Sequence, residues 1–244
     1  MNKAEMIFGM HPVMEAIMAG REFDKILVQK KLKGNQLGDL LTLAGKYNIP
    51  IQYVPPEKLR GITGKNHQGI IAFLSSVEFA SLDNVISTAY TKGESPFLLI
   101  LDRVTDVRNF GAIVRTAECA GVHAVIIPSR GGAALNADAM KTSAGALNVV
   151  PICREPNLKN TIQFLKDSGI AIVGLTEKTK ESLFSHEYTG PLAFLLGSEE
   201  NGISPEYLKK CDRLASIPMK GTIGSLNVSV SAAVALYEAL RQRG

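Results

Sequence analysis

Residues 97–119 read FLLILDRVTDVRNFGAIVRTAEC and contain the pattern that decides the fold. Five apolar residues in a row predict a buried strand over 97–101, and apolar residues at helical spacing predict a helix over 109–119. This order of strand, turn and helix continues along the chain, with strands expected at 124–127, 149–153, 170–175, 192–197 and 214–217 and helices at 137–147, 158–167 and 227–241. Strands that are apolar on both faces and alternate with helices are typical of a parallel sheet covered on both sides. We therefore expect an α/β domain over residues 97–244.

The first 75 residues form a second, smaller pattern of helices and strands. Pro12 and Gly20 bracket a short helix, and further elements are expected as strands at 25–28, 51–54 and 69–77 and a helix at 37–47. The polar stretch 92–96, KGESP, ends in residues that favour loops. We divide the chain into a small α/β domain over 1–75, a linker over 76–96 and the parallel-sheet domain over 97–244.

Composition excludes several classes of protein. With 45% hydrophobic and 20% charged residues, the chain is neither disordered nor fibrous. Its apolar runs are about five residues long, whereas a membrane-spanning helix needs about twenty. Charged residues and a proline near the N-terminus exclude the apolar core of a signal peptide, so we expect a cytoplasmic protein. Three scattered cysteines without metal-ligand spacing favour buried free thiols over disulfides or zinc: Cys119, Cys153 and Cys211.

All of the excess positive charge lies in the first third of the chain. Residues 1–75 hold ten Lys and Arg against six acids, whereas residues 76–244 hold 17 of each. A local basic surface is suited to a polyphosphate partner, although a solvated lysine face is an equally good interpretation. The expected phosphate contacts are Lys25, Lys30, Lys31, Lys33 and Lys65.

Polar or glycine-rich residues follow three strands of the second domain. Ligands of parallel α/β sheets bind at the carboxyl ends of strands, so these segments are the expected site. Each also has a plain structural interpretation. Asn109, Ser225 and Asn227 are residue types that cap helices, and Arg115 is spaced to pair with Glu118. The segments are 102–117, 194–202 and 217–229.

Several common enzyme motifs are absent from the sequence. It contains no GxGxxG, no GxxxxGK[ST], no GxSxG and no HExxH, which weakens nicotinamide, P-loop, α/β-hydrolase and zinc-protease interpretations. The four histidines are dispersed, so no metal site is expected.

Taken together, the three segments resemble the motifs of the SpoU branch of the SPOUT RNA methyltransferases. The matching stretches are NFGAIVRTA (109–117), LLGSEENG (195–202), and IPMKG (217–221) with SLNVSVSAA (225–233), and KTSAGA (141–146) is also similar. FGMHPV (8–13) and HQGI (67–70) resemble the ribosomal-protein-like substrate-binding domain of the subgroup that methylates a guanosine ribose in 23S rRNA. Val107 replaces a usual proline and Ser231 lies in a run usually richer in alanine, but neither change removes a side chain that the chemistry uses.

The resemblance implies a fold and a cofactor. In that family the C-terminal part of the domain forms a deep trefoil knot, which is rare among proteins. The methyl donor, S-adenosylmethionine, is held largely by backbone groups. By motif match the donor-binding residues are Gly197, Gly202, Ile217, Met219 and Leu226.

The resemblance also implies catalytic residues. Arg115 is the first candidate, as a cation that stabilises the developing alkoxide and binds the adjacent phosphate, because a guanidinium stays protonated and makes a poor base. Asn109 would orient the ribose or its phosphate, and Glu199 would fix side chains of the first motif or a donor group. Ser225 and Asn227 would complete the pocket.

The leading hypothesis is transfer of a methyl group to a ribose 2′-hydroxyl of 23S rRNA. A methyltransferase that acts on tRNA is the alternative within the family, and a non-catalytic RNA-binding or ribosome-assembly factor is the alternative outside it. The last helix is apolar nearly all round, so its own domain or another subunit must bury it, and we expect a homodimer.

Overall fold

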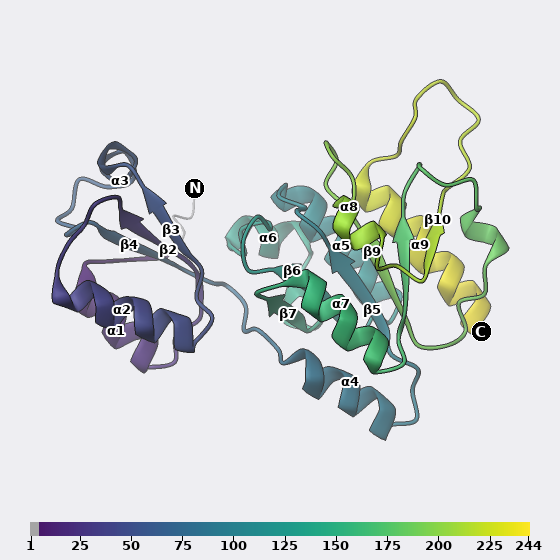
Figure 1. The fold of residues 1–244 in the computed structure, drawn as a ribbon, viewed down its shortest axis with the longest axis horizontal. Coiled ribbons are helices and arrows are strands. Elements are labelled where there is room, and N and C mark those ends of the chain that lie inside the picture. The colour runs from purple at the N-terminus through teal and green to yellow at the C-terminus, as the bar shows by residue number, and fades with distance from the viewer. Residues whose placement is uncertain (1–4) are drawn as a thin grey trace. The chain divides into compact units, whose positions relative to one another are not determined.

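The computed structural model describes residues 5–244 and divides the chain into two compact units (Figure 1). The first contains residues up to Glu78 together with Leu135–Ala137, and the second contains Phe79–Ala134 and Asp138–Gly244. The first unit is a four-stranded sheet in the order β1-β4-β2-β3, in which β4 is antiparallel to β1 and β2. Its elements are β1 (Met6–Phe8), α1 (Met10–Met18), β2 (Phe23–Gln29), α2 (Asn35–Lys46), β3 (Ile51–Val54), α3 (Pro56–Ile62) and β4 (Ile70–Leu74).

The first unit has helices packed on both faces of its sheet, and two of its elements were not expected from the sequence. α1 and α2 pack on one face of the sheet through Val13, Ile17 and Leu40, all of which are buried. α3 covers part of the other face through Leu59. β1 and α3 are additional to the expected elements. They span three and seven residues, too short for a periodic pattern to mark them.

The second unit contains a six-stranded sheet in the order β10-β8-β9-β5-β6-β7, and every paired neighbour is parallel. The expected α/β fold with a parallel sheet is therefore confirmed; the knot stays a prediction. Its elements are α4 (Leu82–Thr91), β5 (Phe97–Leu101), α5 (Val107–Cys119), β6 (Ala124–Pro128), α6 (Ala137–Thr142), η1 (Ala146–Asn148), β7 (Ile152–Glu155), α7 (Leu158–Asp167), β8 (Ala171–Leu175), η2 (Leu183–Ser185), β9 (Leu192–Leu196), α8 (Pro205–Leu208), β10 (Arg213–Ala215) and α9 (Val228–Arg243).

Helices cover both faces of this sheet, which keeps the central strands out of water. α4 and α7 pack on one face, and α5 and α9 lie together on the other (Figure 1). All five residues of β5 and all five of β9 are buried. In the part of the chain that the structure describes, no helix has the length and apolar character needed to cross a membrane.

The expected linker, 76–96, contains a packed helix. α4 begins at Leu82 behind Ser81, whose hydroxyl accepts a hydrogen bond from the Asn84 amide. Leu82 and Ile86 are buried in the same apolar cluster as Leu98 and Ile100 of β5. Apolar residues at helical spacing in this stretch therefore form part of the second unit's core.

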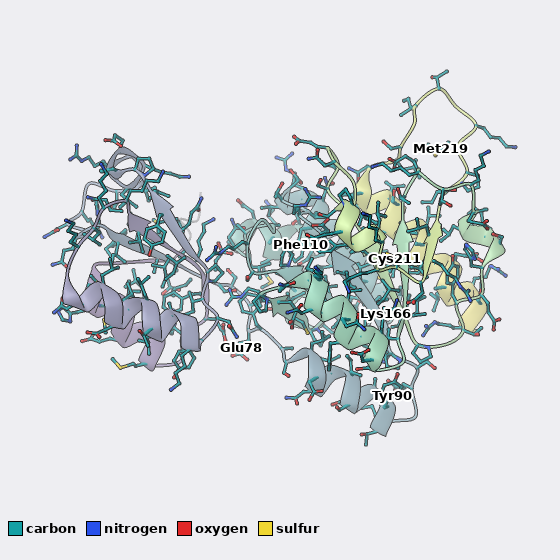
Figure 2. All side chains as sticks on the ribbon, in the orientation of Figure 1. Glu78, Tyr90, Phe110, Lys166, Cys211 and Met219 are labelled. Atoms are coloured by element: carbon teal, nitrogen blue, oxygen red, sulfur yellow. The ribbon has the colours of Figure 1, made fainter. Side chains whose placement is uncertain are left out.

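The cysteines differ from one another in exposure. Cys153 is fully buried in the sheet, and burial raises the pKa of its thiol to about 12. Cys211 is half-buried beside Lys166 and Asp212, and burial raises its pKa to about 11 (Figure 2). Cys119 is exposed at the end of α5, so the expectation of a buried thiol is wrong there. All three thiols are free.

Gly111 allows α5 to pack closely against the end of α6. A Cβ atom at this position would overlap the side chain of Thr142 and lie 2.9 Å from the Ser143 amide nitrogen. Ser143 is itself fully buried, so the backbone there has little room to move. The NFGAIVRTA stretch therefore needs a glycine for packing, whatever its other residues do.

Replacing Gly111 by alanine is expected to destabilise the second unit by about 1–3 kcal/mol, because the added methyl group must displace Thr142 and Ser143. Gly45→Ala in α2 is the matched control: nothing lies within 4 Å of that position, and alanine there is expected to stabilise the helix by about 0.5–1 kcal/mol. Hydrogen–deuterium exchange of the α5 and α2 amides measures each effect. Unchanged or slower exchange in α5 of Gly111→Ala would contradict the prediction.

Candidate functional site

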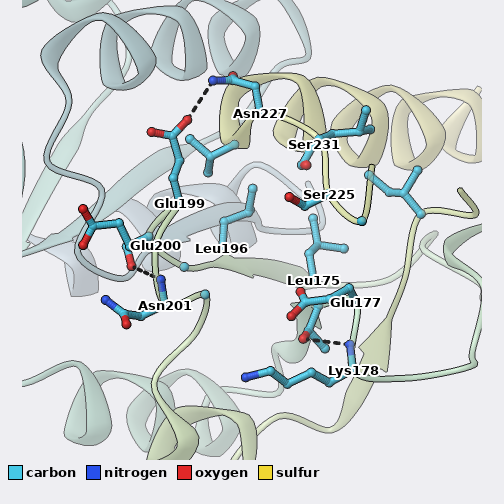
Figure 3. Close-up of a pocket in the computed structure, with 18 of the residues that line it drawn as sticks. Leu175, Glu177, Lys178, Leu196, Glu199, Glu200, Asn201, Ser225, Asn227 and Ser231 are labelled. Carbon is cyan, nitrogen blue, oxygen red and sulfur yellow. Dashed lines mark hydrogen bonds between the residues drawn. The ribbon is translucent and has the colours of Figure 1, made fainter. Parts of the chain in front are cut away.

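A cavity of about 710 Å³ lies where β8, β9 and β10 end (Figure 3). Leu175, Leu196 and Ala215, the last residues of these strands, form its floor. The loop between β10 and α9 and the first residues of α9 form the opposite wall. In the sheet β9 lies between β8 and β5, and the chain then crosses β8 to reach β10, so the cavity lies where the strand order reverses, as ligand sites of α/β sheets do.

Most of the expected site residues line this cavity. The donor-binding candidates among them are Gly197, Gly202, Ile217, Met219 and Leu226, and the catalytic candidates are Glu199, Ser225 and Asn227. Met219 lies on the loop between β10 and α9 (Figure 2). The structure thus brings residues from two distant segments of the sequence to one place.

Three polar side chains form a closed ring at this site. The Asn109 amide nitrogen donates to Glu199 Oε1 at 2.9 Å, and the Asn227 amide nitrogen donates to the same oxygen at 2.8 Å. Asn227 also donates to Asn109 Oδ1 at 3.1 Å. The ring ties α5 and the start of α9 to the loop after β9. Glu199 therefore holds the side chain of Asn109, the first residue of the NFGAIVRTA stretch.

Helix capping accounts for part of this arrangement. Asp106, rather than the expected Asn109, caps α5: its Oδ1 accepts hydrogen bonds from the Arg108 and Asn109 amides at 2.9 and 2.8 Å. The Asn109 side chain is therefore available to the ring. Asn227 does cap α9, through Oδ1 and the Ser229 amide, while its nitrogen serves the ring. Asn227 therefore both caps α9 and takes part in the ring.

A buried carboxylate supports the loop after β9 from below. Asp102 directly follows β5 and is 2% exposed. Its Oδ2 accepts two hydrogen bonds of 2.7 Å from the Ser204 amide and hydroxyl, and both of its oxygens pair with Arg103, whose pKa is raised by this hydrogen bonding. Arg103 also donates to the Gly202 carbonyl at 3.2 Å. These contacts hold the C-terminal end of the turn that carries Glu199.

Gly197 is required by the path of the chain. A Cβ atom at this position would overlap the backbone of Gly202 and Ile203, because the loop folds back on itself. The Gly202 amide closes this turn by donating to the Ser198 carbonyl at 2.8 Å. A side chain at position 197 would therefore disrupt the loop before it affected any ligand.

Arg115 lies outside the cavity. It follows Asn109 by six residues of α5, which places it about 240° further round the helix. Its side chain is exposed and has no hydrogen bond or ion pair within residues 5–244, including the expected pair with Glu118. The structure brings Asn109, Glu199 and Asn227 together but does not bring Arg115 to them.

Sequence reasoning missed two contributions to the site. Glu177 and Lys178 line the cavity from the end of β8, a fourth strand end that the three chosen segments leave out. The signal was present, since Thr176-Glu177-Lys178 follows an apolar strand directly. No sequence pattern indicates the contact between Asp102 and Ser204, because the two residues are 102 positions apart in the chain.

Comparison with known proteins identifies the family of this chain. Residues 96–237 match the profile of the SpoU rRNA Methylase family, and residues 6–80 match the profile for RNA 2′-O ribose methyltransferase substrate binding. The chain belongs to the SpoU rRNA methylase family. This membership confirms the expected class of enzyme, an RNA methyltransferase that uses S-adenosylmethionine.

Individual relatives cover nearly the whole chain. A protein of Staphylococcus saprophyticus named as a TrmH family tRNA/rRNA methyltransferase is 39% identical over 98% of this chain and 96% of its own length. The similarly named YacO of Bacillus subtilis is 36% identical over the same shares. The relatives' names leave the choice between tRNA and rRNA open.

Solved structures share the fold. The SpoU methyltransferase AviRb of Streptomyces viridochromogenes, determined in complex with AdoMet, superposes with a TM-score of 0.62 at 24% identity and covers 98% of this chain and 90% of its own. The TrmH/SpoU tRNA modifying enzyme of A. aeolicus has a TM-score of 0.56 at 30% identity, with 66% of this chain and 84% of its own covered.

The chemistry of the cavity fits a nucleoside-containing methyl donor. Its volume lies in the range typical of small-molecule sites, roughly 300–1,000 Å³. Apolar side chains of Leu196, Ile217 and Leu226 alternate in it with polar backbone at strand ends. When S-adenosylmethionine is bound, it supplies an electrophilic methyl group, and the residues that line the cavity are the candidates to hold it.

Asp102→Asn is expected to destabilise the second unit by about 2–3 kcal/mol, because an amide nitrogen replaces an oxygen that faces hydrogen-bond donors and Arg103 loses its partner. Faster hydrogen–deuterium exchange over 197–204 and weaker donor binding in calorimetry would report the loss. Asp106→Asn is the matched control. Asparagine caps helices as well as aspartate does, so this variant is expected to stay within about 0.5 kcal/mol of the parent. Equal effects of the two changes would refute the role of Asp102.

Proposed function

We propose that this protein transfers a methyl group from S-adenosylmethionine to the ribose 2′-hydroxyl of a guanosine in 23S rRNA. The ring of Asn109, Glu199 and Asn227 beside the cavity is the observation that carries the proposal. It places fixed polar groups next to a pocket of the right size and chemistry. The match of residues 6–80 to a 2′-O ribose substrate-binding profile supports the ribose as acceptor.

The two parts of the chain have different tasks in this proposal. Residues 1–75 bind RNA through their basic surface, and residues 97–244 hold the donor and carry out the transfer. Lys30, Lys31 and Lys33 are exposed on the segment between β2 and α2, where phosphates can reach them. The reaction takes place in the cytoplasm, where ribosomal RNA is assembled.

The protein acts as a homodimer in this proposal. α9 buries one side against its own unit, through Ala232, Leu236 and Ala239. Its other side leaves Val230 46% exposed and Tyr237 51% exposed, and Ile223 in the preceding loop is 74% exposed. A second copy of this surface would cover these apolar groups.

Mapping ribose methylation in cells with and without the protein identifies the substrate. We expect one 2′-O-methylguanosine to disappear from 23S rRNA in its absence, with tRNA unchanged. Loss of a tRNA methylation instead would support the tRNA alternative. If no methylation changed while the purified protein bound RNA without measurable donor affinity, the non-catalytic alternative would replace the proposal.

Arg115→Ala is expected to lower single-turnover methyl transfer by about 10²–10³-fold with donor affinity kept, because the exposed guanidinium stabilises charge on the ribose and its phosphate. Lys159→Ala, which removes a charge from exposed surface on α7, controls for net charge and is expected to leave the rate unchanged. A normal rate for Arg115→Ala removes this residue from the mechanism.

Changing Lys30, Lys31 and Lys33 together to glutamine is expected to weaken RNA binding and to flatten its dependence on salt. Each lost phosphate contact on single-stranded RNA lowers the slope of log K against log salt by about 0.7. Fluorescence anisotropy with transcribed 23S rRNA fragments measures both quantities. Lys46→Gln at the other end of α2 is the control, with binding close to that of the parent. An unchanged slope in the triple variant would move the RNA contacts elsewhere.

A further inference from the structure

The methylation reaction needs a proton acceptor, and few groups in the cavity can provide one. As the 2′-oxygen bonds to the methyl carbon, the carbon–sulfur bond breaks and its electron pair stays on sulfur. The oxygen would be left with three bonds and a positive charge unless it lost its proton. Its acidity therefore rises steeply during the transfer, so even a weak base suffices if it is in place.

The titratable side chains among the described residues that line the cavity are Glu177, Lys178, Glu199 and Glu200. None of these lining residues is a histidine or a cysteine. Lysine and arginine side chains are proton donors rather than acceptors, which excludes Lys178, and Arg115 lies outside the cavity as well. The acceptor must then be one of the three carboxylates or water.

Glu199 is the carboxylate whose position is fixed. Its Oε1 receives hydrogen bonds of 2.9 and 2.8 Å from two different elements of the fold. All three glutamates are exposed, but over residues 5–244 the carboxylates of Glu177 and Glu200 have no hydrogen-bond or ion-pair partner. A catalytic group held in place costs less to orient in the transition state than a mobile one.

The two oxygens of Glu199 have different partners. Both amide donors converge on Oε1, and Figure 3 shows the bond from Asn227. Within the described chain Oε2 accepts no hydrogen bond. Asn227 cannot turn its amide round without loss, because its Oδ1 already accepts from the Ser229 amide at 2.9 Å. The ring therefore leaves one carboxylate oxygen of a cavity-lining residue available to a ligand.

We propose that Glu199 Oε2 accepts the hydrogen bond of the ribose 2′-hydroxyl and takes its proton as the methyl group is transferred. The inference rests on the proposed function. The products are the methyl ether, the neutral thioether and a protonated Glu199, which returns its proton to water. Arg115 keeps its separate role beside the phosphate.

Glu199→Gln is the decisive variant, because glutamine keeps an oxygen for the two asparagine amides and replaces Oε2 by a nitrogen. We expect single-turnover methylation at saturating donor to fall by at least about 10²-fold, while the lost charge weakens donor binding in calorimetry by about tenfold or less. If Glu199 served only to hold the ring, the rate would stay near that of the parent, and that result overturns the proposal. Glu206→Gln on α8 makes the same charge change outside the cavity and is expected to keep the parent rate.

Rescue by a small carboxylate distinguishes proton transfer from support of the loop. Glu199→Ala leaves space where the side chain was, and added formate is expected to restore part of its methylation rate but none of that of Glu199→Gln. No rescue in a folded Glu199→Ala protein speaks against proton transfer. Restoration of both variants to the same extent would show a general salt effect and also overturn the proposal.

Binding gives a readout that does not depend on turnover. Once the target nucleotide is mapped, an RNA fragment with its 2′-hydroxyl is expected to bind the parent protein about tenfold more tightly than the 2′-deoxy fragment, a difference absent in Glu199→Ala. An equal preference in both proteins refutes the contact. A parent protein that methylates no RNA would refute the proposed function itself, whereas a methylating parent with a fully active Glu199→Gln refutes only the role of Glu199.

Discussion

The site depends on one buried carboxylate at the end of the central strand. Asp102 is nearly inaccessible to water, and it holds Ser204 with two hydrogen bonds while Arg103 holds Gly202. A buried charge is stable only when it is paired and hydrogen-bonded. Loss of these contacts would therefore disturb both the end of β5 and the turn over 197–204. The turn between Gly197 and Ser204 is therefore fixed at its C-terminal end by β5 and at its start by β9.

Because the ends of the turn over 197–204 are held in place, the position of Glu199 within it is also restricted. Glu199 lies on this turn and joins Asn109 of α5 to Asn227 of α9. The same three contacts that close the ring set the direction of the first turn of α9, which forms one wall of the cavity. Donor pocket and polar ring are thus built from the same few backbone segments, and a change in one is expected to alter the other.

The sequence predicted the parallel sheet well because each strand of the second unit is a short apolar run between helices. Eight of its ten candidate site residues line the cavity, because residues that follow parallel strands gather at one edge of the sheet. It missed α4 as part of the core, because Leu82 and Ile86 give only a weak pattern. It assigned the cap of α5 to Asn109 and not to Asp106, because both residue types cap helices and only the observed bonds distinguish them.

The charges of the cavity indicate how binding of donor and RNA is divided. Its lining contains three carboxylates, those of Glu177, Glu199 and Glu200, against one lysine. A negatively charged wall attracts a sulfonium cation and repels a phosphate. In the proposed reaction the RNA backbone must therefore be held by cations outside the cavity, such as the exposed Arg115 and the basic first unit. Only the ribose, which is uncharged, needs to reach the carboxylates. The position of Arg115 outside the pocket then follows from electrostatics, because a guanidinium inside it would weaken binding of the donor.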